Sequence, residues 1–214
     1  IEAPPIAFRK VTAEGRLVRS PDKLQITSLT AKFADGTAKI KGLITRMGGI
    51  AAVDANLQIP DLPINALHKF WPPGVAEGSR RWVLTNIRDG SITNASTSLR
   101  ARIALDGEDK GSVDVGSIDG RFTIADATAN YLAPMPPITN ATATGVFSKK
   151  RLNFKLHRGG VGELPIEEGT VDITGIGTPR AVISVSALVR GPVKPAIKLI
   201  SHPRLNMRRR LGFS

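Results

Sequence analysis

The chain has 214 residues, of which 41% are hydrophobic and 22% are charged, and it contains no cysteine. This length is sufficient for one large domain or two small ones with an ordinary apolar core, and the composition disfavours intrinsic disorder. Without cysteine the chain has no disulfides, no catalytic thiol and no cysteine-ligated metal site, and it suits an oxidising compartment such as a bacterial periplasm.

The net charge is +12, but most of the excess lies near the C-terminus. Residues 190–214 contain seven basic residues and no acidic residue, which leaves +5 on the first 189 positions. Such a tail is either a solvated helix face or a surface for phosphate head groups or nucleic acid. Because it lacks interleaved aromatic residues and any recognised DNA- or RNA-binding motif, we expect no nucleic-acid partner.

The first residues of the sequence do not read as a signal peptide. Residues 1–6 lack the basic region, the apolar run and the initiating methionine of a signal peptide. No stretch approaches the ~18 consecutive apolar residues of a membrane span. We therefore expect a segment of a longer protein, with any membrane anchor outside this sequence.

Alternation of apolar and polar residues dominates the first part of the chain. Over residues 23–33 this period-two pattern predicts a β-strand, and over residues 38–44 it predicts a returning strand. Asp35-Gly36 between them predicts a hairpin turn, because glycine tolerates a positive φ.

The pattern changes to helical spacing between residues 61 and 90. Pro63 suits the first position of a helix, and Pro72-Pro73 would end it. Ser79 is a candidate N-cap of a second helix, which Asp89-Gly90 would end. The sequence therefore predicts a helical insert near residues 63–88 of a strand-rich chain.

Both tryptophans of the chain, Trp71 and Trp82, lie in this insert. Tryptophan side chains serve as interfacial anchors that contact lipid head groups. Two tryptophans on short helices also cover the edge or end of a sheet and prevent it from pairing with another chain. We interpret them as structural plugs.

Alternation returns after the insert and predicts strands over residues 99–105, 152–156 and 181–189. A helical C-terminal segment is then predicted near residues 192–211, beginning at Pro192 and broken at Pro203. The first 189 residues therefore favour a mainly β protein.

A weak repeat accompanies these strands. The pattern Gly-Thr-x-x-Ile-x-Gly occurs at residues 36–42 and again at 169–175, with a fainter copy near 120–124. Repeats of hairpin size indicate a sheet that grows unit by unit rather than a closed globule.

The sequence offers no catalytic or metal-binding constellation. The three histidines, His68, His157 and His202, are far apart and lack a second ligand at metal spacing. Glu167-Glu168 are neighbours that would point apart on a strand, and residues 159–162 lack the Lys-Ser/Thr and helix of a phosphate loop. No Gly-x-Ser-x-Gly motif occurs. We expect no enzyme activity, no metal and no cofactor.

The insert resembles a recurring segment of AsmA-like proteins of the TamB/YhdP group from Gram-negative bacteria. In those proteins a Leu-Pro and a short helix ending in Trp-Pro precede Arg-Trp, an Asn and a Gly before a new strand. The matching residues here are Leu62-Pro63, Trp71-Pro72, Arg81-Trp82, Asn86 and Gly90. Tyr131 with the following Pro136-Pro137 also agrees, as does the segment from Gly191-Pro192 to Gly212. The resemblance covers roughly residues 15 to 214, and His202-Pro203-Arg204-Leu205 departs from it by being more basic.

The resemblance implies one continuous β-rich segment over residues 1–214: an elongated, curved antiparallel sheet forming a U-shaped groove of hairpin repeats. It also implies a periplasmic protein anchored to the inner membrane, whose apolar groove conducts phospholipid towards the outer membrane. The partners would be phospholipid acyl chains, the inner membrane through a region outside this sequence, and an outer-membrane or periplasmic protein. The alternative is a periplasmic scaffold for outer-membrane biogenesis whose apolar face is closed on itself.

The candidate groove residues are the apolar members of the predicted strands. The same alternation also builds the core of any β sandwich, so a closed core remains the competing interpretation. The candidate lipid-contacting residues are Leu24, Ile26, Phe33, Ile40, Leu99, Ile103, Leu105, Phe122, Ile124, Leu152, Phe154, Leu156, Val171, Ile173, Ile183 and Val185.

Overall fold

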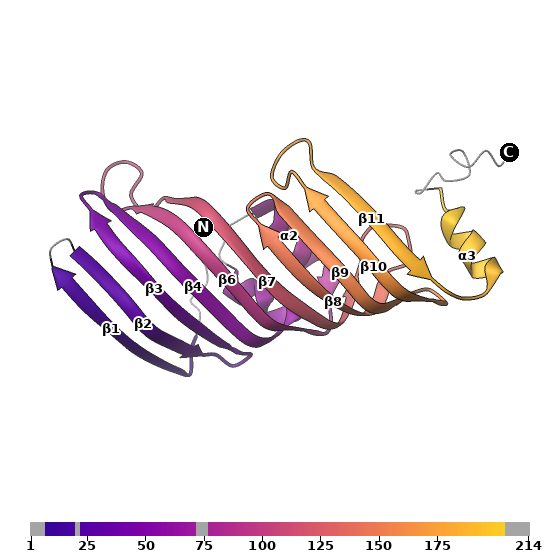
Figure 1. Cartoon of the computed structure of the whole chain (residues 1–214), viewed down its shortest axis with the longest axis horizontal. Helices are drawn as coiled ribbons and strands as arrows, with labels where there is room; N and C mark the ends of the chain where they lie inside the picture. Colours follow the sequence, from indigo (N-terminus) through magenta and orange to yellow (C-terminus); the bar gives the residue numbers. More distant parts are fainter. Residues whose placement is uncertain (1–6, 20–21, 72–76, 204–214) are drawn as a thin grey trace.

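A computed structural model describes residues 7–19, 22–71 and 77–203. Its central feature is one open antiparallel sheet of 11 strands in the order β1-β2-β3-β4-β6-β7-β8-β9-β10-β11, with β5 paired to β7 outside this path (Figure 1). The strands are β1 (Lys10–Arg19), β2 (Asp22–Lys32), β3 (Thr37–Met47), β4 (Ile50–Pro63), β5 (Ile87–Arg88), β6 (Ser91–Ala104), β7 (Val113–Ala129), β8 (Ile138–Ser148), β9 (Arg151–Val161), β10 (Leu164–Thr174) and β11 (Val182–Val189).

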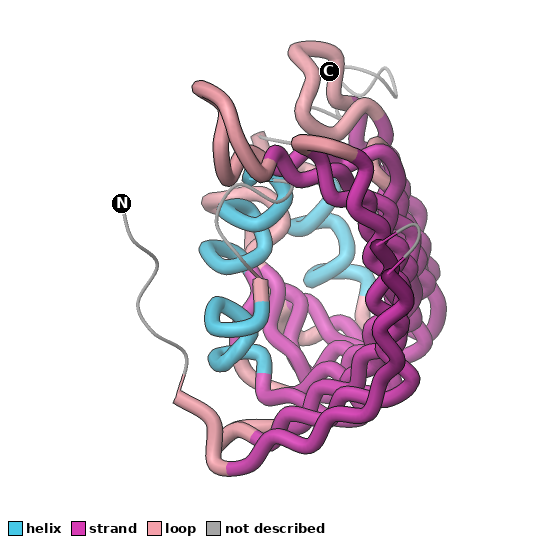
Figure 2. Tube along the Cα trace, turned by 90° about the vertical axis from the view of Figure 1, so that its left-hand side faces the viewer, coloured by secondary structure: helices cyan, strands magenta, loops and turns pink. Residues whose placement is uncertain are grey.

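The helices are few and short. Viewed along the sheet, the strands curve into a C, and the helices of the insert lie at its open side (Figure 2). The helical elements are the 3-10 helix η1 (Ile64–Ala66), α1 (Leu67–Phe70), α2 (Glu77–Asn86) and α3 (Val193–Ile200). Ala196 and Leu199 of α3 pack against the same buried cluster as η1, so α3 also lies on the concave side.

The fold predicted from the sequence is confirmed: a mainly β chain with an extended, curved antiparallel sheet, a short helical insert and a C-terminal helix. Pro192 precedes the first residue of α3 as predicted, whereas the continuation of the tail over 204–214 lies outside the described residues. The predicted N-cap is wrong, because α2 already includes Glu77 and Ser79 lies within the helix. An acidic residue in the first turn suits the positive end of the helix dipole.

The sheet bends at β-bulges. Three residues inside strands have left-handed backbone conformations: Asn94 with φ 51°, Asp126 with φ 55° and Asn140 with φ 50°. The register shifts at or beside each of them, in β6, β7 and β8. An extra residue on one strand bends that strand and increases its twist. On the outer face Arg158 Nη2 lies 2.9 Å from Asp126 Oδ1, which ties β9 to the bulge in β7.

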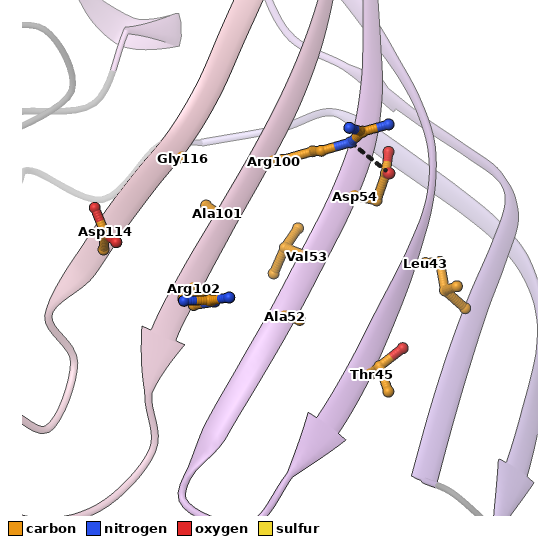
Figure 3. A pocket seen from close by; sticks show the side chains of 10 residues that line it. All are labelled: Leu43, Thr45, Ala52, Val53, Asp54, Arg100, Ala101, Arg102, Asp114 and Gly116. Atoms are coloured by element: carbon orange, nitrogen blue, oxygen red, sulfur yellow. Dashed lines mark hydrogen bonds and ion pairs between the residues drawn. The ribbon is translucent and has the colours of Figure 1, made fainter.

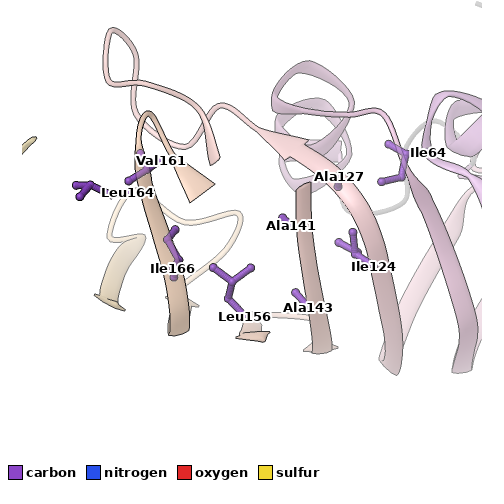
Figure 4. Close-up of a cluster of buried hydrophobic side chains, with 9 residues drawn as sticks. All are labelled: Ile64, Ile124, Ala127, Ala141, Ala143, Leu156, Val161, Leu164 and Ile166. Atoms are coloured by element: carbon purple, nitrogen blue, oxygen red, sulfur yellow. The ribbon is translucent and has the colours of Figure 1, made fainter. Parts of the chain in front are cut away.

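The buried core lies on the concave face and is small. Leu62 and Leu164 are the largest fully buried side chains, with 0% and 2% of their surface exposed. The main cluster joins η1 to the four strands β7 to β10 (Figure 4), and its members are Ile64, Ile124, Ala127, Ala141, Ala143, Leu156, Val161, Leu164 and Ile166. A second cluster beneath α1 contains Ile59, Leu62 and Ala66. The core therefore fixes the insert to the sheet.

We expect position 140 to respond to backbone conformation more than to side-chain size. Asn140→Val places a β-branched residue at φ 50° and should lower the free energy of unfolding by about 1–2 kcal/mol. Asn140→Gly removes the steric strain of this positive φ, so its effect on the free energy of unfolding should be neutral or slightly stabilising. Urea denaturation of both variants measures the difference, and equal stability of the two would contradict the assignment of this bulge.

Candidate functional site

One face of the sheet carries a band of mostly apolar side chains, here called the apolar strip. Directly paired residues of neighbouring strands point to the same face, so the register traces the strip from strand to strand. One row crosses ten strands, and only Thr97 in it has a polar side chain. It runs Ala13, Leu29, Ile40, Leu57, Thr97, Gly120, Phe147, Leu152, Ile173 and Ile183.

The structure places most of the candidate groove residues on this strip. They share its face through parallel rows of pairs such as Leu24 with Ile44 and Val171 with Phe154. The candidates on the strip are Leu24, Ile26, Ile40, Leu99, Ile103, Phe122, Ile124, Leu152, Phe154, Leu156, Val171, Ile173, Ile183 and Val185.

Two candidates lie at the rims instead. Phe33 follows β2 and packs edge-to-face on Phe70, with ring centroids 4.6 Å apart. Leu105 follows β6, and its backbone N–H donates to the carbonyl of Gly49 at 2.8 Å. Both extended the alternating pattern by one step past the end of a strand.

The strip also contains residues that the sequence-based set omitted. Val53 and Leu57 of β4 belong to it, as do Ile118 of β7 and Phe147 of β8. Each follows the alternation of its own strand, so the signal was present. Alanine and glycine neighbours weakened it, and the bulges in β6 and β7 change which residues of these strands share a face.

Exposure along the strip varies strongly. Near the insert the strip is buried, and Ile124 and Leu156 expose 8% and 9% of their surface. Towards the two outer strands it is open, and Leu17 on β1 and Val185 on β11 expose 66% and 58%. The strip is therefore an apolar surface that the helices cover only in part, rather than the interior of a sandwich.

The insert is fixed to both neighbouring parts of the sheet. Lys69 Nζ lies 2.5 Å from Asp35 Oδ2, which ties α1 to the β2–β3 turn beside the Phe33–Phe70 contact. At the other end, the backbone N–H of Asn130 donates to the carbonyl of Asn86 at 2.8 Å. The insert thus returns to the sheet at β5 and holds its position over the concave face.

The two tryptophans are half-buried and belong to neither buried cluster. The carbonyl of Trp71 accepts from Arg80 Nε at 2.8 Å, and the carbonyl of Trp82 accepts from Asn86 Nδ2 at 2.9 Å. These are backbone contacts within the insert. A role as sheet plugs for the indole rings therefore stays a prediction.

The opposite face of the sheet is polar and ion-paired. Arg100 Nε lies 3.1 Å from Asp54 Oδ2, at the edge of an open depression of about 400 Å³ (Figure 3). The depression is also lined by Leu43, Thr45, Ala52, Arg102, Asp114 and Gly116. Val53 and Ala101, which the register places on the apolar strip, border it as well. Charges of both signs line it, so it does not suit an apolar ligand. We place the candidate site on the apolar strip.

The described residues hold no cluster of metal-binding side chains. No group of three His, Asp or Glu side chains within residues 7–19, 22–71 and 77–203 could hold a metal ion. His68 Nδ1 lies 2.8 Å from the carbonyl of Asn65, and His157 Nε2 lies 3.0 Å from Thr144 Oγ1. In that same part of the chain, no helix is long and apolar enough to cross a membrane.

An open, curved antiparallel sheet with one apolar face and a helical insert over its concavity defines an extended β-groove protein. A family model described as YhdP protein matches residues 2–210. The chain belongs to the YhdP family, and the resemblance noted in the sequence is confirmed. No curated protein and no solved structure matches it.

We expect Leu62 to anchor the insert. Leu62→Ala removes a fully buried side chain between β4 and η1 and should lower the free energy of unfolding by about 2–5 kcal/mol. Leu188→Ala on β11, where the side chain is 55% exposed, is the matched control and should change stability by less than about 0.5 kcal/mol. Chemical denaturation measures both. Similar small effects for the two variants would contradict the placement of Leu62.

The Arg151–Asp172 pair on the polar face should be visible in the titration of its carboxylate. Arg151 donates from Nε at 2.8 Å and from Nη2 at 2.9 Å, and these hydrogen bonds lower the pKa of Asp172. Arg151→Ala should raise that pKa towards the ordinary aspartate range, as followed by NMR. Since the folded-state pKa is depressed, the pair stabilises above the unfolded pKa and loses this effect as pH falls. An unchanged titration in the variant would contradict the pairing.

Proposed function

We propose that this chain is a segment of a periplasmic bridge protein, anchored to the inner membrane, whose apolar strip carries phospholipid acyl chains between the inner and outer membranes. The observation that carries the proposal is the row across ten strands from Ala13 to Ile183, in which only Thr97 has a polar side chain. At about 4.8 Å per strand this row is about 43 Å long. It runs across the strands, along the axis of the curved sheet.

The strip suits a ligand that slides. Burying one CH₂ group contributes about 0.8 kcal/mol, so an acyl chain on the strip is held by many small, similar contributions. Along the row the floor consists of Leu, Ile, Ala, Phe and Gly with one threonine, which leaves no deep polar site to trap a chain. The charged head group would stay in water outside the concave face. Neither an enzyme activity nor a nucleic-acid partner forms part of the proposal.

A scaffold for outer-membrane biogenesis is the second candidate. No described strand pairs with the outer edge of β1 or of β11, and β1 is exposed along its whole length. Unpaired edges of this kind accept a strand from a protein partner. This function requires docking at the edges and does not require lipid on the strip.

Site-specific photo-crosslinking distinguishes the two candidates. We expect a photoreactive amino acid at Ile103, Phe154 or Ile183 of the intact protein to capture phospholipid in cells. Matched controls are the adjacent residues on the polar face, Arg102, Lys155 and Ser184, which should capture little or none. Mass spectrometry of the adducts identifies the lipid class.

The scaffold predicts the opposite pattern. If no strip position captures lipid although a photoreactive residue on the edge strand β1 captures a protein, lipid conduction is wrong and the scaffold is favoured. Equal lipid capture on both faces would also contradict the proposal, because it would indicate contact with bulk membrane rather than with a groove.

A further inference from the structure

Three phenylalanines form an aromatic floor within the otherwise aliphatic strip. Phe122 of β7 lies with its ring centroid 5.6 Å from that of Phe154 of β9 in an edge-to-face arrangement. The centroid of Phe147 of β8 is 6.1 Å from that of Phe122. All three side chains are half-buried, and Phe122 and Phe154 pack against the edge of the main buried cluster.

Two glycines set the height of this floor. Gly145 pairs directly with Phe122, and Gly120 pairs directly with Phe147. A methyl group on Gly145 would lie 2.4 Å from Cζ of Phe122, and one on Gly120 would lie 2.4 Å from Cζ of Phe147. Real Cβ atoms do not approach other atoms so closely, so each ring occupies the space that its partner glycine leaves empty. The rings therefore lie low across the neighbouring strand.

The helix α2 lies over the same part of the sheet. Figures 1 and 2 show α2 on the concave side, behind β7 and β8. Its side chains Trp82, Val83 and Leu84 are half-buried, and they belong to neither buried cluster. Helix α2 thus lies across the concave side from the aromatic floor, whereas strip residues on β1 and β11 are exposed.

We propose that Gly120 and Gly145 set the cross-section through which an acyl chain passes between α2 and the aromatic floor, and so determine which chains the groove admits. This inference rests on the proposed lipid-carrying function. Elsewhere on the strip a larger side chain can be avoided by a ligand that moves outward towards the open mouth. Under α2 the ligand cannot move outward, so the height of the phenylalanine rings limits its passage there.

The clearest test is at Gly145, because the three atoms nearest to a new Cβ all belong to the ring of Phe122. The new Cβ of Gly145→Val therefore meets the ring of Phe122 first, and the ring must move off the floor. Gly116→Val is the matched control: it lies in β7 on the polar depression, where the nearest atom to a new Cβ is the carbonyl oxygen of Arg100 at 3.5 Å. Circular dichroism and thermal unfolding establish that both variants fold.

Occupancy is read with a palmitoyl phospholipid in vesicles and two photoreactive positions in the intact protein. Thr97, which pairs with Gly120, reports on the aromatic floor, and Leu24 on β2 reports on the open strip. Gly145→Val should lower capture at Thr97 by about tenfold, the effect of losing roughly two CH₂ contacts, and leave capture at Leu24 unchanged. Gly116→Val should change neither.

Rescue separates this mechanism from damage to the fold. Gly145→Val combined with Phe122→Ala removes the lifted ring and should restore capture at Thr97. Where Gly145→Val lowers the folded fraction, Phe122→Trp alone enlarges the ring and should give the same loss. Capture at Leu24 with undiminished capture at Thr97 in both variants would overturn the inference and leave the proposed function intact. Absence of capture at both positions in the unmodified protein would overturn the proposed function itself.

Discussion

The architecture depends on keeping apolar side chains on one face of a sheet that bends. A strand changes the face of every later side chain when one residue is inserted, so a bulge threatens the continuity of the apolar strip. In this chain the sequence compensates for each bulge. Ile26 and Leu29 of β2 are three residues apart and yet share the strip, because the register shifts between them. The strip therefore remains continuous while the strands curve into a groove.

Curvature and openness also depend on each other. A flat sheet of this length with one apolar face would have to pack against a second sheet to remove that face from water. Here curvature and the helices of the insert cover only the middle of the strip, whereas α3 follows β11, and the outer strands keep their apolar residues exposed. A contiguous exposed apolar surface is typical of a binding surface. The small alanine-rich cluster around Ala127, Ala141 and Ala143 serves to attach the insert, not to fill the groove.

The sequence could predict the elements more readily than their relations. Alternation revealed the strands, and proline and glycine marked the limits of the insert, because these signals are local. The same alternation could also have predicted that Phe147 and Val53 lie on the apolar face. The bulges at Asn94, Asp126 and Asn140 could not be predicted, since a lone Asn or Asp within an alternating segment is equally compatible with a turn. Alternation also did not reveal where β2 and β6 end. For this reason the predicted groove residues included Phe33 and Leu105, which lie just past the ends of these strands. Whether the strip stays open depends on packing between distant segments, which local patterns do not contain.

The division between aliphatic and aromatic parts of the strip has a physical consequence for selectivity. Leucine, isoleucine and valine side chains present a surface on which one CH₂ group of a ligand is equivalent to the next, so affinity varies little along the row. Discrimination requires a place where the ligand cannot avoid the protein on any side. In the proposed passage between α2 and the aromatic floor, the pairing of Phe122 with Gly145 fixes the height of the ring, because ring and backbone are fitted to within a methyl group. A groove built in this way can be permissive along most of its length and selective at one short section, without any polar recognition group.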